Sequence, residues 1–116
     1  MAIIRITNLK LRTIIGINDW EREKKQEIVI NIAITIDATK AAASDDIKDT
    51  IDYKTLTKRI IKEAEASSYF LLEKLCRHVL DIVLEENLAQ EATVRIDKPG
   101  ALRFSESVSL ELTESK

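Results

Sequence analysis

The sequence contains few of the residues that disulfides, metal sites and flexible linkers require. Its single cysteine, Cys76, cannot form an intramolecular disulfide, which favours a reducing compartment such as the cytoplasm. One histidine and one cysteine cannot complete a typical zinc site, so we expect no metal. With two glycines and one proline in 116 residues, no segment resembles a flexible linker, and we expect a single domain over residues 1–116.

Charge and hydropathy argue against other classes of function. The net charge is −2, so no basic surplus directs the chain to nucleic acid or to an anionic membrane. The N-terminus lacks the features of a signal peptide, and polar residues interrupt every apolar run before about 18 residues. A domain of this size buries only about two thirds of its unfolded surface. A sizeable binding site is therefore expected on the surface or between subunits.

Alternation with a period of two predicts strands in four segments. From 28 to 36 every second residue is isoleucine, which predicts a strand with one buried face. The segment 3–17 also alternates, but its phase slips, and a bulge at residues 7–8 would reconcile the two registers. Apolar residues alternate with polar ones again over 92–97 and over 108–112, which predicts the third and fourth strands.

Between the second and third strands the period of the apolar residues becomes helical. Leu56, Ile60 and Ala64 recur at intervals of four, and Asp52 is suited to cap the N-terminus of this helix. A second apolar stripe predicts a helix over 70–86. The order ββααββ predicts an α+β domain, a four-stranded antiparallel sheet with both helices on one face. Because its edge strands would be exposed, we expect chains to associate into a larger sheet or barrel.

Four polar side chains are candidates for chemistry, although each also has an ordinary structural explanation. Lys98 ends the third strand before a Pro-Gly turn, where lysines are commonly solvated. Glu73 lies in the first turn of the second helix, where a carboxylate complements the positive helix end, but three large apolar neighbours draw it toward the core. Tyr53 begins the first helix, where packing is the common role, and Glu21 lies in a run of charges that would normally be solvated.

Taken together, these segments resemble the dihydroneopterin aldolase family over nearly the whole chain. Five pieces carry the resemblance in the family's order: Ile15-Gly16-Ile17 with Glu21 and Gln26, Ser44-Asp45-Asp46, Asp52-Tyr53, Leu71-Leu72-Glu73 and Lys98-Pro99. The runs 3–17 and 101–112 are similar to the dihydroneopterin triphosphate 2′-epimerase branch, which we favour. Bacterial aldolases remain the alternative, because 19–21 and 98–101 resemble them more.

The resemblance implies a T-fold (tunnelling fold) that binds a pterin between subunits of a tetramer or octamer. Glu73, with the backbone near Leu72, matches the pterin anchor, since one carboxylate accepts both adjacent donors of the ring. Lys98, Tyr53 and Glu21 match catalytic positions, with Tyr53 supplied by a different chain from Lys98.

Two further residues are expected at the substrate site. Asp52 belongs to the matched Asp-Tyr pair. Arg103 is a candidate phosphate contact because it flanks Lys98 across the turn, although an ordinary surface arginine is an equal alternative.

The chemistry implied by the resemblance needs no metal or cofactor. Removal of the 2′-hydroxyl proton, assisted by Lys98 through water, lets the C1′–C2′ bond break while its electrons enter the C6=N5 imine of the dihydropterin. Desolvation or a neighbouring cation would help such a lysine, because both favour the uncharged form that can accept a proton. Arg95 and Arg103 are close to Lys98 in sequence and could supply the cation. Release of glycolaldehyde is aldolase chemistry, and its re-addition on the other face is epimerase chemistry. A non-catalytic pterin- or purine-binding module is the remaining alternative.

Overall fold

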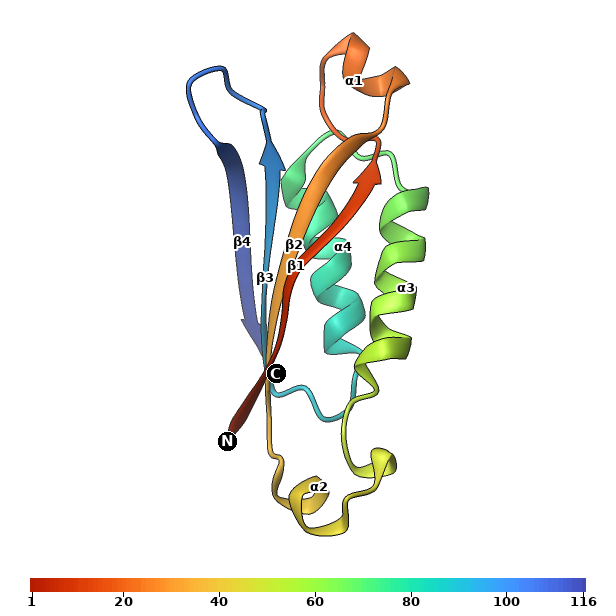
Figure 1. The fold of residues 1–116 in the computed structure, drawn as a ribbon, viewed down its shortest axis with the longest axis vertical. Coiled ribbons are helices and arrows are strands. Elements are labelled where there is room, and N and C mark those ends of the chain that lie inside the picture. Colours follow the sequence, from red (N-terminus) through yellow and green to blue (C-terminus); the bar gives the residue numbers. More distant parts are fainter.

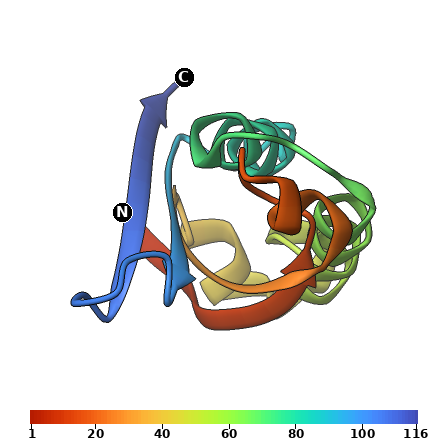
Figure 2. The same cartoon turned by 90° about the horizontal axis from the view of Figure 1, so that it is seen from above.

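One four-stranded antiparallel sheet, covered on one face by two helices, makes up the fold (Figures 1 and 2). The computed structural model describes all 116 residues. Its strands follow each other in the order β1 (Ala2–Thr13), β2 (Gln26–Ile36), β3 (Glu91–Pro99) and β4 (Ser107–Ser115). Helices α3 (Tyr53–Ala66) and α4 (Leu72–Leu84) pack on the same face. The predicted α+β class and ββααββ order are confirmed.

The isoleucines of β2 form the centre of the core. All five side chains that alternate along this strand face the helices and are at most 3% exposed: Ile28, Ile30, Ile32, Ile34 and Ile36. They pack in one cluster with Leu56 and Ile60 of α3 and with Leu75 and Val79 of α4. The helical spacing of these apolar residues turns one stripe of each helix toward the sheet. The period-two and period-four patterns therefore meet in a single core.

The predicted bulge in β1 is confirmed. The register with β2 shifts between Ile6 and Leu9, and Asn8 adopts a left-handed conformation with φ of 54°. Asn31 on β2 accepts a hydrogen bond from the Asn8 backbone N–H at 2.9 Å, and the two side-chain amides pair at 3.2 Å. The bulge lets Ile6 and Leu9 both face the core although their spacing is odd.

Several element boundaries differ from the sequence-based prediction. β1 ends at Thr13 rather than at residue 17, because the chain turns at Gly16, where φ is +127°. The second long helix is shorter than predicted, Leu72–Leu84 instead of 70–86. Three short elements were not predicted: α1 (Asp19–Glu23), α2 (Thr39–Ser44) and the 3₁₀ turn η1 (Ile47–Asp49). Each has only three to six residues, too few for a helical period to appear in the sequence.

The two ends of the molecule carry different elements. α1, the N-terminus of α4 and the β3–β4 loop lie at the upper end in Figure 1. α2 and the N-terminus of α3 lie at the lower end, and the long axis measures 52 Å. Asp52 caps α3 as predicted, accepting the backbone N–H groups of Lys54 at 3.1 Å and Thr55 at 3.2 Å. None of the helices has the length and apolar character needed to cross a membrane.

Candidate active site

A cleft of about 290 Å³ opens at the upper end of the molecule. Its walls come from the β1–α1 loop, α1, the start of α4 and the end of β3. Four of the residues expected at the site line it: Glu21, Leu72, Glu73 and Lys98. These side chains are separated by up to 77 positions in the sequence, so the fold brings them together.

Glu21 and Lys98 form a buried ion pair on one side of this cleft. The Nζ atom of Lys98 donates a hydrogen bond to Oε2 of Glu21, and the two side chains are 13% and 4% exposed. Gln26 donates to the same carboxylate oxygen at 3.0 Å. The other oxygen accepts the backbone N–H of Asn18 at 3.1 Å and its side-chain amide at 2.8 Å. The carboxylate therefore accepts hydrogen bonds from four donors.

These donors keep Glu21 ionised. Burial alone would raise the pKa of this carboxyl group, but the hydrogen bonds from Lys98, Gln26 and Asn18 lower the pKa to about 2. The solvated glutamate suggested by the surrounding charge run is wrong, because α1 turns Glu21 inward while Glu23 and Lys24 stay exposed. At neutral pH the site holds a fixed negative charge beside Lys98.

The direct partner of Lys98 is a carboxylate and not a cation. Arg95, one of the two arginines considered as a neighbouring cation, pairs with Asp97 at 3.0 Å. Arg103 does not line the cleft, and its guanidinium lies 5.8 Å from the ring centre of Phe104. The phosphate contact expected of Arg103 stays a prediction.

Gly16 makes room for the Glu21 carboxylate. A Cβ atom at position 16 would lie 2.2 Å from the carboxyl carbon of Glu21, well inside van der Waals contact. Its φ of +127° also lies in a region that residues with side chains rarely adopt. The turn that ends β1 is thus shaped around the buried charge.

Glu73 offers a second carboxylate of a different kind. It lies exposed in the first turn of α4 and accepts no hydrogen bond from the rest of the chain. A carboxylate in this first turn lies at the positive end of the helix dipole. Its surroundings are therefore more open than its apolar neighbours in the sequence suggested. Both of its oxygens are free to accept donors from a bound molecule in the cleft.

Tyr53 and Asp52 lie outside this cleft. They begin α3 at the lower end of the molecule, whereas the cleft is at the upper end (Figure 1). A helix of 14 residues spans about 21 Å, so the length of α3 separates them from the cleft of the same chain. The Tyr53 side chain is 56% exposed. Their roles in a site stay predictions that need a second chain.

Sequence reasoning missed two residues that build this end of the molecule. Asn18 holds the Glu21 carboxylate, and Arg22 donates hydrogen bonds to backbone carbonyls of two loops beside the cleft. Neither has a sequence signal, because both lie in a polar stretch typical of a solvated turn. Their partners become apparent only when the chain is folded.

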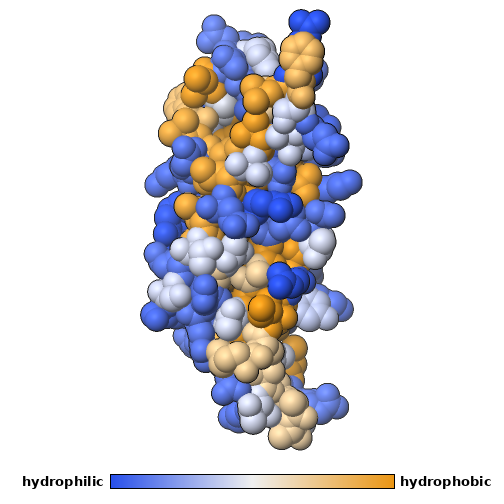
Figure 3. Space-filling view, turned by 90° about the vertical axis from the view of Figure 1, so that its left-hand side faces the viewer, coloured by the Kyte–Doolittle hydropathy of each residue, from blue (hydrophilic) through white to orange (hydrophobic).

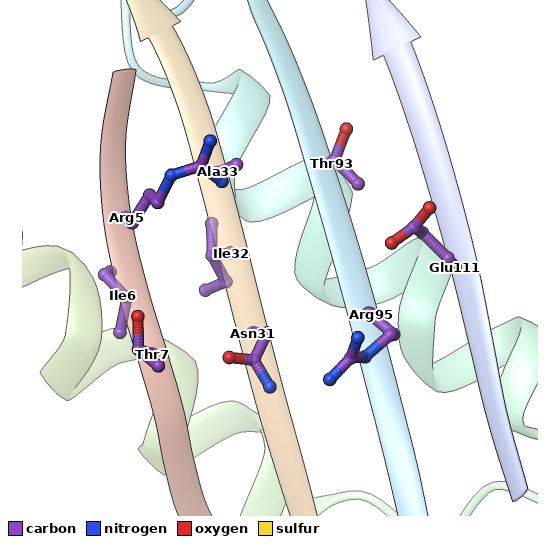
Figure 4. Close-up of a pocket in the computed structure, with 9 residues that line it drawn as sticks. All are labelled: Arg5, Ile6, Thr7, Asn31, Ile32, Ala33, Thr93, Arg95 and Glu111. Carbon is purple, nitrogen blue, oxygen red and sulfur yellow. The ribbon is translucent and has the colours of Figure 1, made fainter.

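A second hollow lies on the helix-free face of the sheet and contains none of the expected catalytic residues (Figure 4). It measures about 220 Å³ and is lined by strand residues only: Arg5, Ile6, Thr7, Asn31, Ile32, Ala33, Thr93, Arg95 and Glu111. It has no buried ion pair. No three His, Cys, Asp or Glu side chains of the molecule come together in a way that could hold a metal ion.

Comparison with known proteins gives consistent matches over nearly the whole chain. The chain is 50% identical over 112 residues to a dihydroneopterin triphosphate 2′-epimerase of Escherichia coli K12, covering 97% of this chain and 93% of that one. A Pseudomonas aeruginosa protein of the same name is 44% identical, covering 97% and 91%. A crystal structure of E. coli dihydroneopterin aldolase in complex with neopterin superposes with a TM-score of 0.94 at 28% identity, covering 99% and 100%.

The sequence model of one protein family spans most of the chain. The model described as dihydroneopterin aldolase matches residues 4–113, which include β2 and β3, most of β1 and β4, and the whole cleft. The T-fold expected from the resemblance agrees with the superposed aldolase structure. This chain therefore belongs to the dihydroneopterin aldolase family.

Proposed function

We propose that this protein is a pterin enzyme that epimerises C2′ of 7,8-dihydroneopterin triphosphate, giving the monapterin form. The observation that carries the proposal is the buried Glu21–Lys98 pair, which lines the same cleft as the free carboxylate of Glu73. A fixed pair is suited to handle protons, and a free carboxylate is suited to bind a heterocycle. The two epimerases at 50% and 44% identity support this substrate.

Glu73 is the proposed anchor of the pterin ring. The N3–H and the 2-amino group of a pterin present two adjacent donors, which one carboxylate accepts in a bidentate pair. Leu72 lines the cleft beside Glu73 and offers backbone groups for the rest of the ring edge. The Glu73 carboxylate accepts no hydrogen bond within the chain, which supports its role as the acceptor for a bound ligand.

Lys98 is the proposed catalytic residue that assists removal of the 2′-hydroxyl proton through water. Loss of this proton lets the C1′–C2′ bond break, and its electron pair moves into the C6=N5 imine to give an enamine and a two-carbon aldehyde. Because the ring itself takes up the electrons, the reaction needs no metal or cofactor. The charge of Glu21 holds Lys98 in place, and re-addition of the aldehyde on its other face inverts C2′.

We also propose that the chain assembles into a tetramer or octamer, in which a second chain completes each site. β1 and β4 are unpaired sheet edges, and Leu110 and Leu112 of β4 are only half-buried. Apolar patches interrupt the polar surface on this side of the molecule (Figure 3). Exposed edges and partly covered apolar strands favour pairing between chains. Tyr53, Asp52 and Arg103 would then contribute from positions outside the cleft of one chain, in a cytoplasmic enzyme.

Product analysis tests this function directly. Purified protein is incubated with 7,8-dihydroneopterin and, separately, with its triphosphate, and the products are separated by chromatography. We expect the 2′-inverted triphosphate as the dominant product. We expect Lys98→Ala to abolish its formation while the protein stays folded. Full turnover by Lys98→Ala would contradict the assigned role of the lysine.

Aldolase activity is the second candidate function. It is favoured by the superposition on the E. coli aldolase bound to neopterin, with a TM-score of 0.94. In that case the same assay yields 6-hydroxymethyl-7,8-dihydropterin and glycolaldehyde as dominant products. Binding of neopterin without turnover of either substrate would leave a pterin-binding module as the function.

A further inference from the structure

Two loops without regular secondary structure lie next to each other and line the cleft. Residues 14–18 contribute Gly16 and Ile17, and residues 67–71 contribute Phe70 and Leu71. A single backbone hydrogen bond joins the loops, from Gly16 N–H to the Tyr69 carbonyl at a long 3.3 Å. This one backbone hydrogen bond holds the two loops together weakly, although both border the proposed substrate site.

The side chain of Arg22 bridges these two loops. Its Nη1 atom donates to the Gly16 carbonyl and to the Tyr69 carbonyl, both at 3.0 Å, and its Nη2 atom donates to the Ser68 carbonyl. The guanidinium lies over the ring of Phe70, with 4.1 Å between its central carbon and the ring centroid. One side chain thus contacts both loops, and it follows Glu21 directly in α1.

Only arginine suits this arrangement. The guanidinium is planar, always charged and carries five donors in a rigid fork, and it stacks on aromatic rings. A lysine ammonium carries three donors on a flexible stem and cannot reproduce the fork. The acceptors are loop carbonyls that no regular ladder satisfies, so the guanidinium also meets their hydrogen-bonding requirement.

The side chain of Tyr69 is also held by hydrogen bonds, so its carbonyl is a fixed acceptor for Arg22. The Tyr69 hydroxyl is hydrogen-bonded to Nδ1 of His78 at 2.7 Å, and Nε2 of His78 to Glu63 at 2.8 Å. These bonds tie the loop to α4 and α3. With its side chain fixed there and its carbonyl bound by Arg22, Tyr69 sets where the chain enters the 70–73 segment.

We propose that Arg22 is a positioning residue that fixes the substrate-binding segment 70–73 relative to the Glu21–Lys98 pair. This inference rests on the proposed function, because Arg22 would set the distance between the ring-binding Glu73 and the proton-transferring Lys98 of that same site. A misplacement of about 1 Å between such groups can cost about 100-fold in rate. Arg22 itself touches no reacting atom and holds the geometry through its neighbours.

The test compares Arg22→Lys with wild type in turnover and in neopterin binding. We expect kcat/KM to fall about 10- to 100-fold, with a rise in KM and a fall in kcat measured per folded protein. Binding of neopterin is followed through the fluorescence of Trp20, the chain's single tryptophan, which lines the cleft. We expect added guanidinium ion to restore part of the turnover of Arg22→Ala, which a general loss of folding would not allow.

Arg77→Lys is the matched control. Arg77 also makes several charged hydrogen bonds, to Asp81 at 2.8 Å and to Glu114 at 3.1 Å, but it does not line the cleft. We expect its substitution to leave kcat and KM unchanged. If Arg22→Lys keeps wild-type kcat and KM, or loses activity only in proportion to its folded fraction, the inference fails.

Amide exchange separates failure of this inference from failure of the proposed function. If wild type neither binds nor converts a pterin, the proposed function is wrong, but the exchange rate at Gly16 still tests the bridge. Faster exchange of the Gly16 N–H in Arg22→Lys than in wild type supports the bridge, because this group is bonded to the Tyr69 carbonyl. An unchanged rate overturns it.

Discussion

At the scale of single residues, the charge of Glu21 links stability to pH. Its pKa falls from 4.5 to about 2 on folding, so the ionised form stabilises the native state. This contribution is fully present above pH 4.5 and is lost as the pH falls through 2. In Glu21→Gln we expect that part of the pH dependence to disappear. The stability difference between wild type and variant should shrink by about 3 kcal/mol from pH 6 to pH 2.

Urea unfolding across this pH range measures the effect. Asp19→Asn is the control, because Asp19 lies exposed on the same short helix and makes no side-chain hydrogen bond. Its substitution should leave the low-pH limb of the stability curve close to that of wild type. A Glu21→Gln curve parallel to the wild-type curve between pH 2 and 4.5 would contradict the buried charged pair.

Gly16→Ala tests the same carboxylate from the other side. The added methyl group would collide with the Glu21 carboxylate, so we expect the Glu21–Lys98 pair to be displaced and activity to fall at least about 10-fold. Gly100→Ala is a matched control, because Gly100 also has a positive φ, +71°, but nothing lies within 4 Å of its added Cβ. It should lose about 1 kcal/mol from backbone strain and keep its activity. Thermal unfolding and turnover of both variants check this.

At the scale of elements, the strands were predictable because their patterns are long. The isoleucine alternation of β2 runs over nine residues, and the slip in β1 revealed the bulge at Asn8. α1 was not predictable, since its five residues lie in a charge run whose inward member, Glu21, depends on Lys98 for a partner. The end of β1 likewise depends on the turn at Gly16 and not on the apolar pattern, which continues to Ile17.

The start of α3 gives a prediction that separates capping from substrate binding at Asp52. Its carboxylate accepts the N–H groups of Lys54 and Thr55, so Asp52→Ala should lower the free energy of unfolding and the thermal midpoint. Asn is an equally good cap, so Asp52→Asn should keep stability. A loss of turnover in Asp52→Asn, measured beside its thermal midpoint, would support the expected role at the substrate site. Equal stability of Asp52→Ala and wild type would contradict the cap.

At the scale of the whole molecule, only part of the site could be predicted from one chain's pattern. Residue types and the family resemblance indicated Glu21, Glu73 and Lys98, and the structure brings these three to one cleft. Composition and spacing could not give the Glu21–Lys98 contact, because 77 positions separate the partners and only the tertiary fold joins them. Tyr53 lies at the other end of the same chain, so its expected role depends on assembly.

Mixing two inactive variants tests whether sites form between chains. Tyr53→Phe keeps Lys98, and Lys98→Ala keeps Tyr53, so each alone should be inactive if both residues are needed. Equal amounts of the two variants are unfolded and refolded together. After random assembly, about a quarter of the sites contain Lys98 from one chain and Tyr53 from another. We expect about that fraction of wild-type turnover, with mixed oligomers confirmed by native mass spectrometry. No chain in the mixture carries both native residues, so any turnover must come from sites shared between two chains. If mixed oligomers form and stay inactive, Tyr53 and Lys98 do not belong to one shared site.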